Sequence, residues 1–414
     1  MSAAFSAAGA TAGRAEETSP SSSGLMPWGA YLDAMRPAGD LVAQTWQPES
    51  EQMRAEVYRQ LMMNLSLGYF VYFQADAEHP DFGPFLNSVF LLQPNPDDNY
   101  WHAPLRGDRI YRVSGERGSV KLVTFNTGSH QMGTTAEQDG RFNTPFLDFD
   151  VDRKGLVHDG KIDVILSAER PAGYAGDWLH MDPATTYLLV TAVSYDWGVE
   201  ADPRLAIECL NPSGPKPRMS VQQIDERLRG LTRFVDQLSR RWIVYDKRLK
   251  AEKGANTVFD YSFNGEGRQI QTYWGGVFDI EPGEALLLET ELPARRPYWN
   301  VQLNDPIFNA LEYAYRQSSL NGHQARIDSD GRFRAVICAE DPGVPNWLDT
   351  VGQTQGTFIG RWYDCDTRPL PKVTRLPVSE VRARLPQDTP SITPAERARV
   401  IAGRNRGLQM RRRW

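Results

Sequence analysis

The chain has 414 residues, of which 41% are hydrophobic and 24% charged, and its formal net charge is -6. This composition is ordinary for a soluble globular protein, and the acidic balance argues against a general nucleic-acid binder. No apolar run approaches the roughly 18 to 20 residues that a membrane-spanning helix requires. We therefore expect a cytoplasmic protein with no nucleic-acid partner and no membrane contact.

The amino-terminal part predicts a disordered tail followed by helices. Residues 1–24 are mostly Ala, Ser, Gly, Thr and Glu, and ordering them would cost entropy without burying apolar surface. From Met26 to Asp76, apolar residues recur every three to four positions, which is typical of amphipathic helices. We expect these helices to cover the first β unit, so that residues 25–212 form one part of the molecule.

Strand patterns dominate from about residue 85 to residue 212. Residues 109–113 and 119–125 predict a hairpin across the glycines at 115 and 118, and Asp159-Gly160 predicts a tight reversal into a strand at 161–166. The alternation of apolar and polar residues is typical of antiparallel sheets with one wet face. This region therefore predicts an antiparallel sandwich or a barrel-like unit.

Residues 213–255 predict a linker and a long helix. Pro and Gly residues at 212–217 break the strand pattern, and Ser220 is a suitable N-cap. Between Val221 and Leu249 the apolar residues lie on one face, and the other face is charged. The apolar face leaves two alternatives open, a contact in a homo-oligomer and packing inside the chain.

A second β unit is expected at residues 256–370, with a short helix at 306–316. The extension at 371–414 is rich in Pro and Arg, and we expect its basic end, from Arg404 to Arg413, to be solvated. The predicted fold class is mainly β within α+β. It has two antiparallel sandwich or jelly-roll-like units joined by the long amphipathic helix.

The run from Asp341 to Trp362 is the strongest candidate for a site. It places turn formers, carboxylates, amides and indole rings between two predicted strands. Aromatic rings supply flat contact area and polar groups fix the orientation of a ligand, so the second unit predicts a pocket for a small molecule. The expected binding residues are Tyr273, Trp274, Trp299, Asn300, Asn304, Asn321, Asn346 and Trp347. The alternative is structural, since the same groups serve turns and cores.

The expected catalytic residues are two carboxylates, one imidazole and one guanidinium. Asp341, Asp349 and His180 are candidates for proton transfer, and Arg316 for stabilising developing negative charge. No nucleotide-binding, serine-hydrolase or HExxH pattern is present, so we expect no cofactor and no metal. A metal site built from histidines of the first unit is a less favoured alternative; these are His102, His130, His158 and His180.

Several motifs resemble one family. The segment DPGVPNWLDT at 341–350, with GEALLLE at 283–289 and YRQSSLN at 315–321, resembles the domain of unknown function 1214. PNPDDNY at 94–100 and YRVSGERG at 111–118 are similar to the companion region of the same proteins. The resemblance implies a bacterial two-part β-sandwich protein without an established reaction, and it implies no catalytic residues.

These observations predict a catabolic-type enzyme that uses no redox cofactor. It would act by acid and base chemistry on a small ring-containing metabolite, as a lyase, hydratase, isomerase or hydrolase. The alternative is a non-catalytic module for small-molecule binding or assembly.

Overall fold

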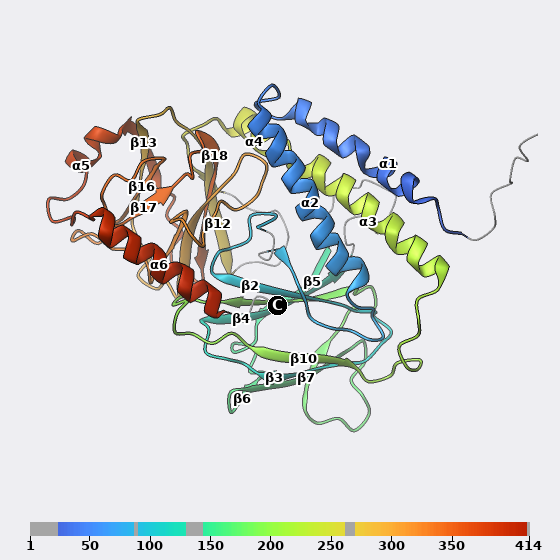
Figure 1. The fold of residues 1–414 in the computed structure, drawn as a ribbon. Helices are drawn as coiled ribbons and strands as arrows, with labels where there is room; N and C mark the ends of the chain where they lie inside the picture. The colour runs from blue at the N-terminus through green and yellow to red at the C-terminus, as the bar shows by residue number, and fades with distance from the viewer. Residues whose placement is uncertain (1–23, 87–89, 130–143, 261–269, 412–414) are drawn as a thin grey trace, which may run out of the picture.

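The computed structural model describes residues 24–86, 90–129, 144–260 and 270–411. It shows two β units with helices packed beside them (Figure 1), which confirms the predicted α+β, mainly β fold class. The predicted disordered tail, apart from Gly24, lies outside the described residues, and so do His130, Arg412 and Arg413.

Two sheets form the first unit. The strands are β1 (Gly83–Pro84), β2 (Asp98–Pro104), β3 (Tyr111–Glu116), β4 (Leu122–Ser129), β5 (Thr144–Asp150), β6 (Val157–His158), β7 (Lys161–Ser167), β8 (Asp177–His180), β9 (Tyr187–Val193) and β10 (Arg204–Cys209). One sheet has the order β1-β2-β9-β4-β5, and the other has the order β10-β3-β7-β6 with β8 beside β7. Alternate residues of both sheets, such as Phe125, Val164 and Val190, fill the core between them.

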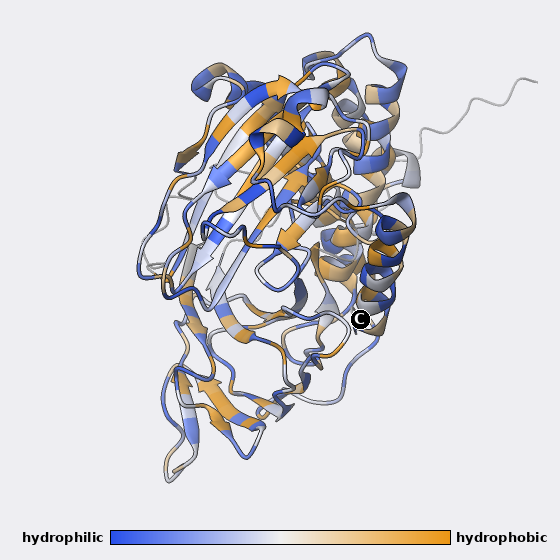
Figure 2. Ribbon diagram, turned by 90° about the vertical axis from the view of Figure 1, so that its left-hand side faces the viewer, coloured by the Kyte–Doolittle hydropathy of each residue, from blue (hydrophilic) through white to orange (hydrophobic). Residues whose placement is uncertain are grey.

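The second unit is another pair of sheets. Its strands are β11 (Phe259–Asp260), β12 (Gln271–Asp279), β13 (Glu284–Thr290), β14 (Tyr298–Asn304), β15 (Ser319–Asn321), β16 (Phe333–Cys338), β17 (Trp347–Asp349), β18 (Gln355–Tyr363) and β19 (Lys372–Pro377). The sheet β11-β12-β18-β14-β15 packs on the sheet β17-β16-β13-β19 through a core that includes Trp274, Trp299 and Trp362. Figure 2 shows that hydrophobic and hydrophilic residues are mixed along the strands.

Helices join and cover the two units. They are α1 (Trp28–Gly39), η1 (Asp40–Gln44), α2 (Glu51–Phe73), α3 (Val221–Trp242), α4 (Tyr245–Lys253), η3 (Val378–Glu380), α5 (Val381–Arg384) and α6 (Pro394–Met410). Ser220 caps the start of α3, as the sequence predicts, and it forms a capping box with Gln223. None of the helices within the described ranges has the length and apolarity needed to cross a membrane.

The apolar stripe of α3 packs inside the chain. Phe234, Leu238 and Trp242 lie in one cluster with Leu67 of α2 and Phe308 of the second unit. Of the two alternatives for this stripe, the structure supports internal packing.

Two local predictions are wrong. The segments at 109–113 and 119–125 do not form a hairpin, because β3 pairs with β7 and β10, whereas β4 pairs with β5 and β9 in the other sheet. Residues 306–316 are not helical, because Asp305 Oδ1 accepts hydrogen bonds from the main-chain N–H groups of Ile307 and Asn309 and so replaces the helical pattern. In contrast, Asp159 and Gly160 adopt positive φ and join β6 to β7 as predicted.

The carboxy-terminal helix is not a solvated basic tail. Arg397, Arg404 and Arg411 follow one another at intervals of seven residues, and each is at most 7% exposed. Such spacing places Arg397 and Arg404 on one face of α6, and Arg411 follows directly after the last residue of the helix. The three arginines lie against both β units. The expected solvation of Arg404 and Arg411 is therefore corrected.

Candidate functional site

A buried polar face of the second unit lies against the first unit. In β14, Trp299, Val301 and Leu303 point into the core of the second unit, so the alternate residues point the other way. These alternate residues are Tyr298, Asn300, Gln302 and Asn304, and all four are buried. Their hydrogen-bond partners include residues 94–97 of the first unit, so this face meets protein rather than solvent.

Arg361 carries the positive charge of this face. It lies on β18, in register with Tyr273 on one side and Asn300 on the other, and it is 6% exposed. Its Nη1 donates to Gln302 Oε1 at 2.7 Å and to Asn300 Oδ1 at 3.3 Å, and its Cζ lies 5.6 Å from the centre of the Tyr273 ring. No carboxylate among the described residues lies within 4.0 Å of the guanidinium nitrogens. Arg361 is thus a buried cation whose described hydrogen-bond partners are neutral, while the charge of Asp98 acts on it from farther away.

A chain of hydrogen bonds links Arg361 to Asp98. Asn300 Nδ2 donates to Asn95 Oδ1 at 2.5 Å, and Asn95 Nδ2 donates to Asp98 Oδ1 at 2.8 Å. The Tyr100 hydroxyl donates to Asp98 Oδ2 at 2.9 Å. Burial raises the pKa of Asp98 to about 7, although the charge of Arg361 opposes the rise. Asp98 is therefore the carboxyl group of this cluster that gains or loses a proton near neutral pH.

The neighbouring Asp97 has a different environment. Its carboxylate accepts hydrogen bonds from the Tyr298 hydroxyl at 2.7 Å, from Asn321 Nδ2 at 2.7 Å and from Trp197 Nε1 at 2.8 Å. Arg411 Nη1 donates to the Asp97 main-chain oxygen at 2.7 Å. These four donors come from both units and from the chain next to α6, so Asp97 holds the units together.

The predicted catalytic carboxylates lie elsewhere, in ion pairs. Asp349 is 1% exposed, and its Oδ1 accepts from Arg316 Nη2 at 2.9 Å and from the Val351 main-chain N–H at 2.8 Å. Asp341 Oδ2 accepts from Arg397 Nε of α6 at 2.9 Å. Both contacts match the structural alternative that the sequence left open.

The polar atoms of Asn346 and Trp347 are bonded to the main chain. Asn346 Nδ2 donates to the carbonyls of Arg326 and Arg334, and its Oδ1 accepts from the Arg326 N–H. Trp347 Nε1 donates to the Cys338 carbonyl at 2.9 Å. A small surface pocket beside Asn346 has a volume of about 10 Å³, enough for one water molecule but not for a ring.

The other predicted residues separate into three places. Trp274 and Trp299 lie in the core between the sheets of the second unit. His180 is exposed on β8, where its Nδ1 contacts the Ala168 carbonyl oxygen at 2.9 Å. The remaining predicted binding residues lie on the polar face described above; these are Tyr273, Asn300, Asn304 and Asn321. The described part of the chain contains no group of three or more His, Cys, Asp or Glu residues suited to a metal ion.

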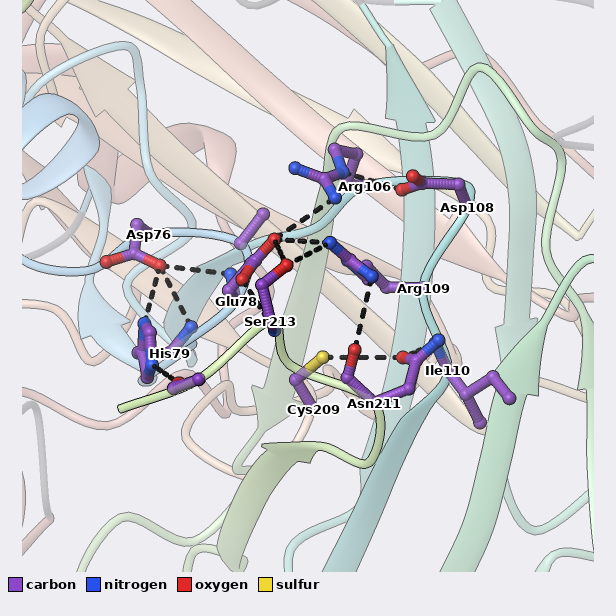
Figure 3. A network of polar contacts seen from close by, with 12 residues as sticks. Asp76, Glu78, His79, Arg106, Asp108, Arg109, Ile110, Cys209, Asn211 and Ser213 are labelled. Carbon is purple, nitrogen blue, oxygen red and sulfur yellow. Dashed lines mark hydrogen bonds and ion pairs between the residues drawn. The ribbon is translucent and has the colours of Figure 1, made fainter. Parts of the chain in front are cut away.

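A second polar network fastens the linker to the first unit (Figure 3). Glu78 accepts from the Ser213 N–H at 2.9 Å and from its hydroxyl at 3.0 Å, and it forms an ion pair with Arg109. The hydrogen bonds from Ser213, with the charge of Arg109, lower the pKa of Glu78 to about 2. His79 Nε2 contacts the Gly214 carbonyl at 2.9 Å. Because these groups are matched to one another, the network is structural.

Asp98 and Arg361 are not among the residues that the sequence predicts for the site. Both lie within segments that the sequence marks, at 94–100 and 341–362. The available signal was the strict alternation of β14, with amides on one face and apolar residues on the other. A strand of that kind, inside a unit that packs against another, indicates a buried polar face.

Comparison with known proteins finds a family model that matches one region of the chain and solved structures with a similar fold. The model of the family described as "Protein of unknown function (DUF1214)" matches residues 284–367. A crystal structure of an uncharacterized protein from Burkholderia cenocepacia is similar with a TM-score of 0.77 and 25% sequence identity, over 86% of this chain and 97% of that chain. A crystal structure of a protein from Vibrio parahaemolyticus reaches a TM-score of 0.44 at 12% identity, over 81% of this chain and 100% of that chain. No curated protein matches. Residues 284–367 are therefore similar to DUF1214, which confirms the resemblance of the motifs at 283–289, 315–321 and 341–350, whereas those at 94–100 and 111–118 lie outside the match.

Proposed function

We propose that the face between the two units binds a small organic acid at Arg361 and that Asp98 exchanges a proton with it. The reaction class is that of a cofactor-independent lyase, hydratase, isomerase or hydrolase. The Tyr273 ring beside Arg361 offers a flat surface that suits a ring-containing substrate.

The buried guanidinium of Arg361 carries this proposal. A buried charge is costly unless it is paired and hydrogen-bonded, and amide oxygens compensate a cation less well than a carboxylate does. A bound organic anion would supply the missing negative charge and form charge-assisted hydrogen bonds. Asp98 supports the catalytic part, because a group that titrates near neutral pH is suited to both giving and taking a proton.

Binding without turnover is the second candidate function. Both carboxylate oxygens of Asp98 already accept hydrogen bonds, from Asn95 and Tyr100, and the residue is 8% exposed. This arrangement suits a carboxyl group that tunes the charge of the site without touching the ligand.

Thermal shift and calorimetry with a panel of aliphatic and aromatic carboxylates test the proposal. We expect at least one acid to raise the melting temperature of the wild type, and R361Q to weaken its binding at least about tenfold. Arg404→Gln is the matched control, because Arg404 is also buried and has no ion pair with a described residue but lies beside Trp197. R404Q should lower the melting temperature of the free protein and keep the response to the acid.

Proton exchange is measured on the acid that binds. NMR in deuterated water should show exchange of a substrate C–H proton with the wild type and its loss with D98N, while D98N still binds the acid. If no acid binds, or if R361Q responds like the wild type, the proposal is wrong. If the wild type binds the acid but does not exchange its C–H proton, the protein has the second function, binding without turnover.

A further inference from the structure

Asn126 is a buried amide without hydrogen bonds to any described residue. It lies on β4, is 3% exposed, and neither its Oδ1 nor its Nδ2 has a partner in the described part of the chain. Buried polar side-chain atoms are nearly always hydrogen-bonded, and leaving one unpaired costs roughly 1–3 kcal/mol. A side chain that is unpaired at both atoms is therefore a candidate for contact with a ligand.

Asn126 lies on the outer face of the first unit. The adjacent Phe125 belongs to the core between the two sheets of that unit, so Asn126 points to the opposite face. Its cross-strand neighbours are Asp148 of β5 and Leu189 of β9. Leu189 packs in the cluster formed by α2, α3 and Phe308, so this face is turned toward the helices and the second unit.

The polar face of the second unit meets this outer face at a corner. Tyr298 and Tyr363 of the second unit pack on Leu122 and Val193 of the first. In Figure 1 the strands of the β12-β18 sheet run toward β2, β4 and β5 at this junction. The two sheets therefore stand as two walls that meet at Tyr363.

Arg361 and Asn126 project from these two walls. Arg361 precedes Tyr363 by two residues on β18, so both side chains lie on the same face. On the other wall, burial and the carboxylates of Asp150 and Asp148 raise the pKa of Tyr363, and Asp148 is the cross-strand partner of Asn126. The corner thus has a guanidinium on one wall and an unpaired carboxamide on the other.

We infer that the ligand of this site is an organic anion with a carboxamide-like group, its acid held by Arg361 and its amide by Asn126. This inference deepens the proposed function and rests on it. A carboxamide both donates and accepts, so it matches the unpaired Nδ2 and Oδ1 of Asn126 with two hydrogen bonds. Hydrogen bonds made only with the ligand also reject analogues that lack the amide, because the site atoms then stay unpaired.

Matched pairs of ligands test the inference by calorimetry. Succinamate, glutaramate and adipamate are compared with 4-methylpentanoate, 5-methylhexanoate and 6-methylheptanoate, in which a branched alkyl end replaces the amide. For at least one chain length we expect the amide-bearing acid to bind the wild type about tenfold more tightly. Asn126→Leu should remove this difference and leave binding of the alkyl acid unchanged, whereas R361Q should weaken both members of the pair.

The free protein gives an independent readout. Because the amide of Asn126 has no partner, N126L should keep or raise the melting temperature. Asn126→Ala provides the same ligand comparison if N126L does not fold.

These experiments distinguish failure of the inference about Asn126 from failure of the proposed function. If acids bind through Arg361 without preference for the amide at any length, or if N126L keeps the preference, the inference is wrong and the proposed function stands. A marked loss of melting temperature in both N126L and N126A shows that Asn126 makes structural bonds and overturns the inference. If no acid binds the wild type, both the inference and the proposed function are wrong.

Discussion

Asp97 and Asp98 are adjacent in the sequence, but their carboxylates have different hydrogen-bond partners. Asp97 is surrounded by donors from both units, whereas Asp98 is linked through Asn95 and Asn300 to the guanidinium of Arg361. A motif of two aspartates cannot show this difference, because the partners come from residues about 200 positions later. The role of each carboxylate is thus set by tertiary contacts.

Asp246 on α4 is a buried carboxyl group with a raised pKa. It is 1% exposed, its Oδ1 is unpaired, and its Oδ2 accepts from Gln355 Nε2 at 2.6 Å. Burial, with the nearby charge of Asp305, raises its pKa to about 7. A carboxyl group whose pKa is higher in the folded state than in the unfolded state contributes stability at acidic pH. That contribution is lost as the pH rises from about 4 to about 7.

Asp246→Asn should therefore flatten the pH dependence of stability. We expect the variant to gain about 1–4 kcal/mol over the wild type between pH 4 and pH 7, because its amide cannot ionise. Urea unfolding across this range measures the difference. Asp163→Asn, which changes an exposed carboxylate paired with Arg112, is the control. Parallel profiles for D246N and the wild type would show that the burial of Asp246 has no such cost.

At the scale of elements, α6 fastens the two units through three arginines. Arg397 contacts Asp341 and Gln317, Arg404 contacts Ser319, and Arg411 at the end of the helix pairs with Asp202 of the first unit. Thr393 and Glu396 form the capping box that fixes the start of the helix.

The pair of Arg411 and Asp202 should dominate the stability of this attachment. The two side chains are only 1% and 2% exposed, so Arg411→Met leaves a buried carboxylate without its counter-ion. We expect a loss of about 3–5 kcal/mol in urea unfolding. Arg112→Met, which removes an exposed pair with Asp163, should cost at most about 1 kcal/mol. Equal losses in the two variants would contradict the importance assigned to the buried pair.

Local sequence patterns predict most helices and strands, but they do not predict which strands pair with one another. The amphipathic helix, the caps and most strands follow from periodicity and turn residues. The pairing of β3 and β4 with different sheets could not be read from the chain, because sequence neighbours are usually paired and nothing local opposes it. Similarly, the spacing of Arg397 and Arg404 shows a face of α6 but not what that face meets.

The candidate site was only partly predictable for the same reason. Tyr273 and Asn300 were selected for their chemistry and do lie beside Arg361. The motif around Asn346 and Trp347 drew attention through its turn formers, yet its polar atoms bond to the main chain. Turn-forming residues and ligand-binding residues are the same types, so composition alone cannot separate them.

At the scale of the molecule, the two β units share a buried polar interface. Tyr298 is the central contact: its hydroxyl donates to Asp97 Oδ2 and accepts from Asn95 Nδ2, both at 2.7 Å. An interface of this kind couples the stability of the two units. If the units separated, buried polar groups on both sides would lose their hydrogen-bond partners.

We therefore expect one calorimetric unfolding transition for the whole chain. Tyr298→Phe should shift that single transition downward, at a cost of about 1–3 kcal/mol, since it leaves Asp97 and Asn95 each short of one bond. Tyr315→Phe is the matched control, because Tyr315 is 61% exposed. Two separate transitions in the wild type would show that the units unfold independently.

The contact between Arg411 and Asp202 also bears on synthesis, since the two residues are separated by 209 positions. On the ribosome, the first unit is made long before the guanidinium that neutralises its enclosed carboxylate. Until then the carboxylate of Asp202 lacks its counter-ion and must stay hydrated. Final closure of that region therefore waits for the last helix to emerge.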